Sequence, residues 1–378
     1  MLSIWEKESF YKPVDIIITG SGLMGLWAAY ELKCRAPQLE ILRLDKDKIP
    51  TGASTRNAGF ACFGSPTELL QNAATMGTNA MLDIVDARYR GIKKIRHILG
   101  DAAINYQDCG GYECIGKDYK HYNQLNDKLH WLNTRLEQVT GSENTFRINN
   151  YLIQAMGLSG FDSLIETHCE GALHSGLLVQ SLMQLVKEKG VQIMMGQHVK
   201  AWQQNQNEIE LHTETNHFKT QKLIVATNGF TGKLLPALNI EPARGQVIVT
   251  RPIDGLKLKG TFHYNEGFYY WRNLENRVLL GGARNMAIDD ERTDQLHVSA
   301  TIQAELERFL AVHILQGYNL QPEGLIEHRW AGLMGFTEDK KPQVTKVENN
   351  VWAAISCNGM GVALTPVIAE QLAVSVLA

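Results

Sequence analysis

The chain has 378 residues, of which 44% are hydrophobic, so it is long enough for about two domains with a sizeable core. Its 40 acidic and 37 basic residues leave a net charge near −3, which excludes a general electrostatic attraction to nucleic acid or an anionic membrane. The six cysteines form no C-x-x-C pair and no cysteine–histidine cluster has zinc spacing, so we predict reduced thiols and no metal site.

The N-terminal segment, residues 1–15, lacks the apolar region of a signal peptide. No uncharged apolar run is long enough to span a bilayer, and the longest such run, residues 16–30, contains three glycines. We therefore expect a cytoplasmic protein without a transmembrane segment.

The first predicted elements form a β-turn-α-β unit. The sequence "VDIIIT" (14–19) predicts a buried strand, "GLWAAYELK" (25–33) a helix and "LEILRLD" (39–45) a second strand. A unit of this size is typical of a mononucleotide-binding fold.

The turn of this unit is "GSGLMG", a G-x-G-x-x-G pattern. Gly20 permits the tight turn, Gly22 lets the backbone approach a pyrophosphate at the helix N-terminus, and Gly25 allows close packing of helix on strand. Asp45, twenty residues beyond Gly25, suits a carboxylate that accepts hydrogen bonds from a ribose. An ordinary glycine-rich turn and a plain surface carboxylate remain the alternatives.

The later elements are predicted in the same way. Ser65, Pro66 and Glu68 predict a helix start with a capping box, and Gly77 a possible break. The leucine stripe of residues 122–141 indicates core packing and not a zipper, because it covers only about three heptads. The other predicted elements are a strand at 110–116, a helix at 175–190, strands at 191–196 and 222–229 flanking a meander at 199–218, strands and one helix in 241–327, a strand at 351–356 and a helix at 362–378.

The segment "TGASTRNAGF" (51–60) distinguishes FAD from NAD. It is not a third Rossmann strand but a loop of small residues interleaved with Ser54, Arg56 and Asn57. Small side chains let backbone amides approach a ligand closely. Together, "GSGLMG", Asp45 and "GASTRNAG" resemble the FAD-dependent oxidoreductases of the D-amino-acid oxidase, glycine oxidase and sarcosine oxidase superfamily. The form "GAS-x-RN-x-G" is most similar to members that include γ-glutamylputrescine oxidoreductases.

The resemblance covers nearly the whole chain. It continues through "HSGLLVQSLMQLVKEKGVQI", "LIVATNGFTGKLLP", "ARGQ", "WAGLMGFTEDKKP" and "NGMGVALTP", although His174 and Ser175 replace the usual Asp-Pro. It implies an α/β and α+β fold with a discontinuous Rossmann-like FAD-binding domain (1–98, 165–240 and 328–378). A mixed antiparallel-sheet substrate domain would be formed by 99–164 and 241–327.

The resemblance also implies roles for particular residues. The pyrophosphate would be held by Gly20, Gly22 and Gly25, and the ribose by Asp45. The segment that runs towards the isoalloxazine would comprise Ser54, Arg56, Asn57, Ala58 and Gly59. The adenine would meet the backbone of Val199, and the flavin pyrimidine would lie near Gly359, Met360 and Gly361. Leu23, Met24, Lys46, Ala226, Asn228 and Gly332 lie in the matching stretches and complete the implied FAD contacts.

The chemistry implied is transfer of a hydride from the carbon next to an amine to the flavin, which gives an imine that hydrolyses. No general base is required if the amine arrives neutral, so no catalytic residue is assigned. Amino-acid oxidases of this family have "WAGLRP", where this chain has Met334, and a second family arginine falls on Gly359. Because a bidentate arginine is hard to replace in binding a carboxylate, we expect the substrate to be an amine, or an amino acid whose carboxylate is bound by other residues.

Three further substrate-site candidates are left open. Phe268 and Tyr270 are predicted either to line an aromatic wall or to belong to a sheet core, and Arg272 to be either a relocated clamp or a domain-surface arginine. In sarcosine-oxidase-like members of the family a cysteine near the position of Gly332 holds the flavin covalently, and in other relatives a histidine after "GAS" does so. This chain has no cysteine between Cys169 and Cys357 and no histidine after "GAS", so the resemblance implies non-covalent FAD.

The substrate and the electron acceptor, oxygen or quinone, are not specified by these patterns. The alternative functions are a flavin domain that acts on a modified tRNA base, an NAD-dependent dehydrogenase and a non-catalytic flavoprotein. The slight acidity and the lack of Lys/Arg clusters argue against the first of these, so no nucleic-acid partner is expected.

Overall fold

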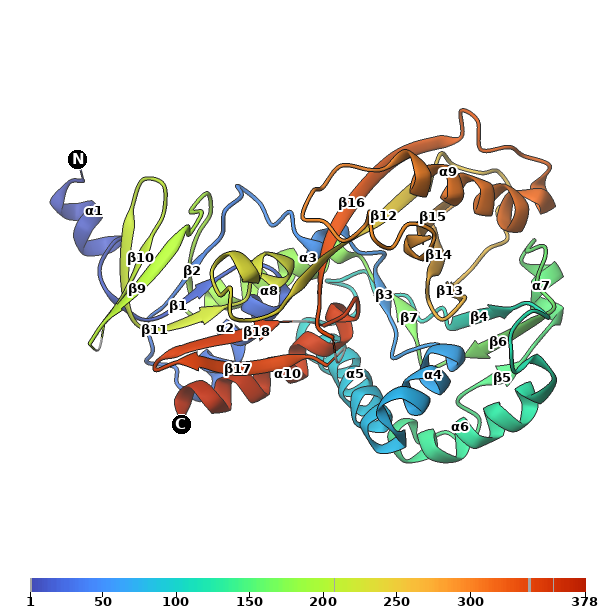
Figure 1. The fold of residues 1–378 in the computed structure, drawn as a ribbon, viewed down its shortest axis with the longest axis horizontal. Coiled ribbons are helices and arrows are strands. Elements are labelled where there is room, and N and C mark those ends of the chain that lie inside the picture. The colour runs from blue at the N-terminus through green and yellow to red at the C-terminus, as the bar shows by residue number, and fades with distance from the viewer. Residues whose placement is uncertain (1, 207, 339–340, 356) are drawn as a thin grey trace. The chain divides into compact units, whose positions relative to one another are not determined.

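The computed structural model describes residues 2–206, 208–338, 341–355 and 357–378 and divides the chain into two compact units (Figure 1). Unit 1 comprises residues 1–56, 175–243 and 333–378, and unit 2 comprises residues 57–174 and 244–332. Among the described residues, no helix is both long and apolar enough to cross a membrane. The end of the strand predicted at 351–356 and one residue of the predicted meander, 207, lie outside the described residues.

Unit 1 contains a largely parallel sheet with helices. Its elements are α1 (Ile4–Ser9), β1 (Val14–Thr19), α2 (Leu23–Arg35), β2 (Ile41–Leu44), α3 (Ala53–Arg56), α8 (Ser175–Glu188), β8 (Gln192–Met194), β9 (Ala201–Asn205), β10 (Glu208–His212), β11 (His217–Val225), the 3₁₀ helix η2 (Asn228–Lys233), β17 (Gln343–Glu348), β18 (Val351–Ile355) and α10 (Gly361–Leu377). The strand order is β17-β18-β11-β1-β2-β8, and the meander β9-β10 extends from β11. The strands from β18 to β8 are mutually parallel.

The centre of unit 1 is apolar because β1 is buried on both faces. Ile16, Ile17 and Ile18 are at most 1% exposed, as expected for a strand covered on both sides. Helix α2 packs against α8 and α10. The parallel strands and their covering helices confirm the predicted Rossmann-like architecture.

Unit 2 is built on a mixed sheet. Its elements are β3 (Phe60–Ala61), α4 (Pro66–Met76), α5 (Thr78–Leu99), β4 (Gly111–Ile115), α6 (Leu125–Thr140), β5 (Arg147–Ile148), α7 (Tyr151–Ala155), β6 (Ser163–Thr167), β7 (Gly171–Ala172), most of β12 (Glu241–Thr250), β13 (Thr261–Tyr264), β14 (Tyr269–Leu274), β15 (Arg277–Gly282), α9 (Ala300–Phe309) and most of β16 (Ile326–Phe336). The order of the main sheet is β16-β12-β15-β14-β13-β4-β6-β5. Most of the pairings are antiparallel, while β13 and β4 are parallel.

Two hydrophobic clusters stabilise unit 2. One joins strands β13–β15 to α9 around Phe262, Trp271 and Phe309, all at most 1% exposed. The other joins α4, α5 and α6, and it buries the predicted leucine stripe of α6, apart from the half-buried Val139 at its end. The stripe is therefore core packing, as the sequence indicated.

The boundary between the units differs from the prediction at its first position. The first segment of unit 1 ends at Arg56 and not at residue 98. The reason is that α4 and α5, which the sequence assigned to the first domain, pack against α6 of unit 2. The other segments of unit 1 are residues 175–243 and 333–378, and the FAD-binding domain of 165–240 and 328–378 stays a prediction.

The start of α4 also departs from its predicted chemistry. Ser65 is the N-cap and Pro66 the first helical residue, but the Ser65 hydroxyl donates to the Glu113 carboxylate at 2.9 Å and makes no capping bond. Glu68 pairs with Arg88 at 2.9 Å and so takes no part in a capping box. Gly77, with φ +88°, separates α4 from α5 as expected.

Two buried carboxylates hold the segment that leads into α4. Glu113 accepts hydrogen bonds from Ser65 and Thr67, and Glu170 accepts from the backbone N–H groups of Phe63 and Gly64 at 2.7 and 3.3 Å. Burial raises the pKa of Glu113 to about 7 and that of Glu170 to about 8, although these hydrogen bonds oppose the shift.

We expect Glu170→Gln to flatten the dependence of unfolding free energy on pH. With its pKa raised on folding, Glu170 binds a proton more tightly in the folded state, so its contribution to stability is full below pH 4 and is lost as pH rises through 8. Removing it should change the slope by up to about 1.4 kcal/mol per pH unit between pH 5 and 8. Urea unfolding at several pH values measures this.

The matched control is Glu137→Gln, on the exposed face of α6. It should leave the slope unchanged. A Glu170→Gln protein with the wild-type slope would show that Glu170 does not hold its proton in the folded state.

Candidate functional site

The candidate site in unit 1 lies at one edge of the parallel sheet. The register places Thr19 beside Leu44 and Val225, so β1, β2 and β11 end at the same edge. The residues that follow these strand ends are Gly20, Asp45 and Ala226, all predicted from the sequence. The carboxyl edge of a parallel sheet is where such folds bind ligands.

The three glycines of the first loop are each required by close contacts. A Cβ on Gly20, whose φ is +100°, would lie 2.5 Å from the Ala226 carbonyl oxygen. One on Gly25 would lie 2.4 Å from the Gly20 carbonyl oxygen, and one on Gly22 would lie 2.8 Å from the Ser54 hydroxyl. The loop before α2 is therefore a cradle in which these three positions are fitted to glycine.

Side chains from two other segments organise this loop. The Ser54 hydroxyl accepts a hydrogen bond at 2.9 Å from the N–H of Leu23, which is the first residue of α2. The Asp45 carboxylate accepts from the N–H groups of Ser21 at 2.6 Å and Asp47 at 3.1 Å. Asp45 therefore links the ends of β1 and β2.

Beneath the loop lies a charge that the sequence analysis missed, Arg43. Its side chain is fully buried in β2, and its Nη2 donates to the Gly20 carbonyl oxygen at 2.6 Å. Among the residues that the structure describes, its Nε and Nη1 atoms have no hydrogen-bond partner, and neither has the buried hydroxyl of Ser21. Burial lowers the pKa of Arg43 to about 9 and Asp45 partly offsets this, so the guanidinium is still cationic at neutral pH.

A buried arginine without a salt bridge is costly, and an anion bound to the loop would supply its missing countercharge. The glycine cradle and the orphaned atoms of Arg43 and Ser21 therefore fit a diphosphate at this point. The signal in the sequence was a charged residue in the middle of an otherwise apolar strand, "ILRL".

The remaining predicted residues of unit 1 vary in accessibility. The Lys46 ammonium lies over the Phe230 ring, 4.0 Å from its centroid. Four other predicted residues have buried side chains, so only their backbone is suited to meet a ligand: Leu23, Met24, Val199 and Ala226. The Asn228 amide bridges the Leu333 carbonyl oxygen and the Gly335 N–H. Gly359 and Met360 precede α10 and Gly361 is its first residue, while Arg56 is the last residue of α3.

Met334 and Gly359, which stand where amino-acid oxidases of the resembled family have arginines, are neighbours in unit 1. A Cβ on Gly359 would lie 3.6 Å from the Met334 sulfur. The structure thus brings the two positions together, and neither side chain carries a charge.

In unit 2, the predicted Arg272 is bonded to the backbone. It is 3% exposed, and its Nη1 donates to the carbonyl oxygens of Gly59 and Leu173 at 3.0 and 2.9 Å. These bonds fix the segment that contains Asn57, whose Oδ1 accepts from the Gly59 N–H at 2.8 Å. The geometry favours a structural role for Arg272 over a substrate clamp. Its buried position also excludes the other prediction, that Arg272 lies on the surface of the domain.

The other predicted residues of this unit are packed against its strands. Ala58 packs on a small cluster of Val247, Val249 and Leu279, and Gly332 is buried in β16. Phe268 precedes β14 and packs against the main core, which corresponds to the sheet-core alternative.

Tyr270 belongs instead to an aromatic group that we call the aromatic wall, formed by Phe60, His263 and Tyr270. His263 and Tyr270 face each other across β13 and β14, and both rings meet Phe60 edge-on, at centroid distances of 5.2 and 6.0 Å. Burial lowers the pKa of His263 to about 4 and raises that of Tyr270 to about 12, so both are neutral at pH 7. Nothing in the sequence distinguished His263 from the other eleven histidines.

Comparisons with known proteins give a family match over most of the chain. Residues 15–374 match the family described as FAD dependent oxidoreductase. The chain is 22% identical over 393 residues to "Probable oxidoreductase OrdL" of Haemophilus influenzae, covering 96% of this chain and 83% of that protein. It is 23% identical over 383 residues to γ-glutamylputrescine oxidoreductase of Escherichia coli, strain K12, covering 95% and 82%.

Among solved structures, L-proline dehydrogenase from P. horikoshii superposes with a TM-score of 0.75 at 17% identity, over 96% of this chain and 93% of that one. This likeness shows a shared fold, and it confirms the predicted fold class.

Proposed function

Because the chain belongs to the FAD-dependent oxidoreductase family, we propose that it oxidises the C–N bond of an amine or an amino acid. FAD supplies the redox chemistry by accepting a hydride from the carbon next to nitrogen. The resulting imine takes up water and hydrolyses to a carbonyl compound and ammonia, or a smaller amine where the substrate is a secondary amine. Oxygen or a quinone would then take the two electrons.

The observation that carries the cofactor part of this proposal is the glycine cradle above Arg43. The N-terminal amides of α2 and the buried guanidinium of Arg43 would hold the diphosphate, and the Asp45 carboxylate would accept hydrogen bonds from the ribose hydroxyls. The N-terminus of α10, at Gly361, would stabilise negative charge on the flavin ring. With no cysteine at Gly332, we propose that FAD is held without a covalent bond, and flavin released by acid precipitation would support this.

The substrate part rests on the uncharged pair Met334 and Gly359. Neither residue can grip a carboxylate as an arginine does, which favours an amine, or an amino acid whose carboxylate lies elsewhere. Considered by itself, the aromatic wall of unit 2 is neutral, which suits the apolar part of a substrate and offers no countercharge to an ammonium group. The wall therefore favours an amine that reacts in its neutral form.

The test is an absorbance spectrum of the purified protein followed by anaerobic addition of amines and amino acids. We expect a two-band flavin spectrum that is bleached by one class of amine and not by glycine or simple D-amino acids. Rapid bleaching by glycine would contradict the substrate proposal, and a colourless protein that takes up no FAD would contradict the cofactor proposal.

We expect Tyr270→Ala to raise the KM for the bleaching amine about tenfold, because it removes a ring from the aromatic wall. Tyr270→Phe is the matched control, since it keeps the edge-on packing against Phe60 and should leave KM within about twofold. Steady-state kinetics with a parallel FAD titration measures both. Equal KM values for the two variants would exclude the wall from substrate binding.

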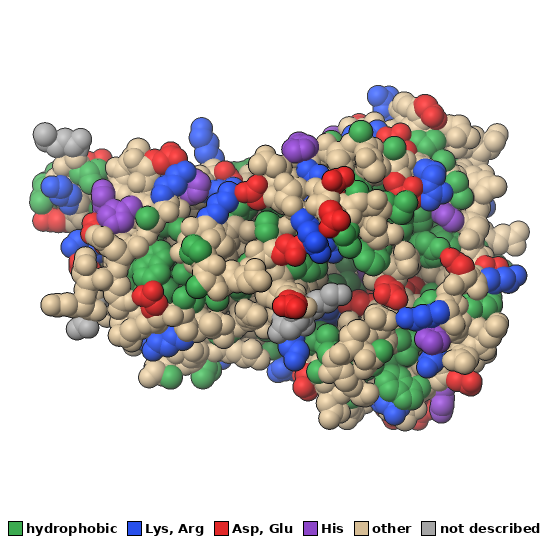
Figure 2. All heavy atoms as spheres, in the orientation of Figure 1, with side chains coloured by type: hydrophobic (Ala, Val, Ile, Leu, Met, Phe, Trp, Pro, Cys, Tyr) green, Lys and Arg blue, Asp and Glu red, His purple; other side chains and the backbone are tan. Residues whose placement is uncertain are grey.

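The alternatives have less support. The face shown in Figure 2 carries interspersed acidic and basic side chains without a continuous basic patch, which offers no electrostatic support for a tRNA substrate. A bound flavin that no amine reduces would favour a non-catalytic flavoprotein, and a nicotinamide requirement would favour a dehydrogenase using NAD.

A further inference from the structure

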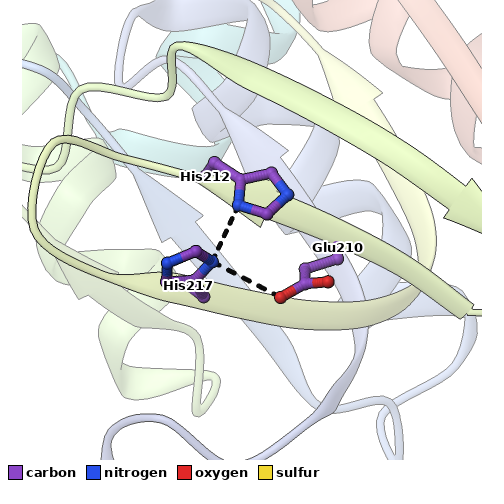
Figure 3. Close-up of side chains that lie close together, drawn as sticks. All are labelled: Glu210, His212 and His217. Carbon is purple, nitrogen blue, oxygen red and sulfur yellow. Dashed lines mark hydrogen bonds and ion pairs between the residues drawn. The ribbon is translucent and has the colours of Figure 1, made fainter.

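The meander of unit 1 carries a cluster that the proposed oxidation does not use, formed by Glu210, His212 and His217 (Figure 3). The His212 and His217 Nδ1 atoms are 2.7 Å apart, and the His217 Nδ1 is 3.4 Å from a Glu210 carboxylate oxygen. One ligand atom from each of the three residues lies within 4.8 Å of the others. The sequence predicted no metal site, because the spacing of these residues is not that of a zinc motif.

The cluster follows from the register of one hairpin. Glu210 and His212 are two residues apart on β10 and share a face, and the antiparallel pairing places His217 of β11 directly opposite His212. The turn between them is closed by hydrogen bonds between Thr213 and Asn216, which fix the register.

The opposite face of the hairpin anchors it to the core. Ile209, Leu211 and Phe218 are at most 1% exposed and belong to the hydrophobic cluster of unit 1. The three candidate ligands therefore project from a strand pair that is held in place, and not from a mobile loop. Such support gives a metal site its geometry before the ion arrives.

The surroundings leave the cluster available to a cation. The other oxygen of Glu210 accepts a hydrogen bond from Gln203 on β9 at 3.1 Å, which orients the carboxylate. Lys219, opposite Glu210 in the register, pairs with Glu208 at 2.6 Å, so its ammonium is engaged beside the cluster. The side chain of His217 is 63% exposed and that of Glu210 is 23% exposed, so an ion can enter from solvent.

We propose that Glu210, His212 and His217 bind a divalent transition-metal ion of the zinc and copper class. Two imidazole nitrogens and one carboxylate oxygen are the ligand types these ions prefer, and water would fill the remaining position. The facing nitrogens can share only one proton between them, whereas a metal ion accepts a lone pair from each. Binding would clamp β10 to β11.

The consequence within unit 1 is local. The Lys200 N–H donates to the His212 carbonyl oxygen at 2.8 Å, and Val199, whose backbone is the proposed adenine contact, immediately precedes it. A metal at the hairpin would therefore stabilise the strand end that carries this segment. The ion would be structural and would take no part in hydride transfer.

The test is isothermal titration of tag-free protein with zinc chloride. We expect one zinc ion per chain, and at least a tenfold loss of affinity in both His217→Asn and Glu210→Gln. The matched control is His130→Asn, an exposed histidine of α6, which should bind zinc as the wild type does. Far-UV circular dichroism and the flavin spectrum confirm that each variant is folded.

Two results would overturn the proposal. One is the lack of any one-to-one binding at zinc concentrations up to about a hundred micromolar. The other is a His217→Asn protein that binds zinc as tightly as the wild type, since the ion would then lie elsewhere. Neither result bears on the oxidation of amines, which is measured without added metal.

Discussion

Replacement of Gly25 by alanine is expected to reduce FAD affinity at least a hundredfold, about 2.7 kcal/mol. The new Cβ would lie 2.4 Å from the Gly20 carbonyl oxygen and 2.9 Å from the Arg43 guanidinium. Because the first of these contacts is with backbone, the loop itself must shift, and the shift would distort the cradle. Fluorescence titration of the apoprotein with FAD measures the change.

The matched control is Gly232→Ala, which should leave FAD affinity within about twofold. A Cβ at Gly232, in the 3₁₀ helix η2, would meet no described atom within 4 Å. If Gly25→Ala bound FAD as tightly as Gly232→Ala, the loop would not be the cofactor cradle.

The second large effect is expected from Arg43→Met. We expect binding of ADP to weaken at least tenfold, about 1.4 kcal/mol, while binding of adenosine stays unchanged. The reason is that the buried guanidinium acts on the diphosphate and not on the nucleoside. The apoprotein should at the same time become more stable, because a buried charge without a salt bridge is replaced by an apolar chain of similar length.

Two further variants separate charge from hydrogen bonding. Arg43→Lys keeps a cation and should retain part of the preference for ADP, whereas Arg43→Gln keeps a donor near the Gly20 carbonyl oxygen but loses the charge. If ADP and adenosine weakened equally in Arg43→Met, the arginine would serve only to position the loop.

Much of the fold was predictable because local patterns and tertiary packing agree. The apolar run of β1, the loop glycines and the leucine stripe of α6 each have one arrangement that satisfies them. The capping box at Ser65 failed because both of its members found stronger partners far along the chain, Glu113 and Arg88. Spacing alone does not reveal such competition.

The site was predictable only in part for the same reason. The loop glycines follow a fixed spacing, whereas the significance of Arg43 depends on which atoms are left without partners in the folded protein. The aromatic wall combines Phe60 with residues about two hundred positions later, and the hairpin cluster needs the register of β10 and β11. Period-two spacing suggested one wall for Phe268 and Tyr270, but the turn before β14 places Phe268 in the core.

The order of strands in unit 1 has a consequence for synthesis of the protein. Strand β1 is made before both of its neighbours in the sheet, and one of them, β11, lies about two hundred residues further along the chain. At roughly 5–20 residues per second, the chain from β1 to β11 takes on the order of ten to forty seconds. During that time an isoleucine-rich strand has an unpaired edge, which invites aggregation. The demand for chaperones during translation should therefore fall mainly on the first segment of unit 1.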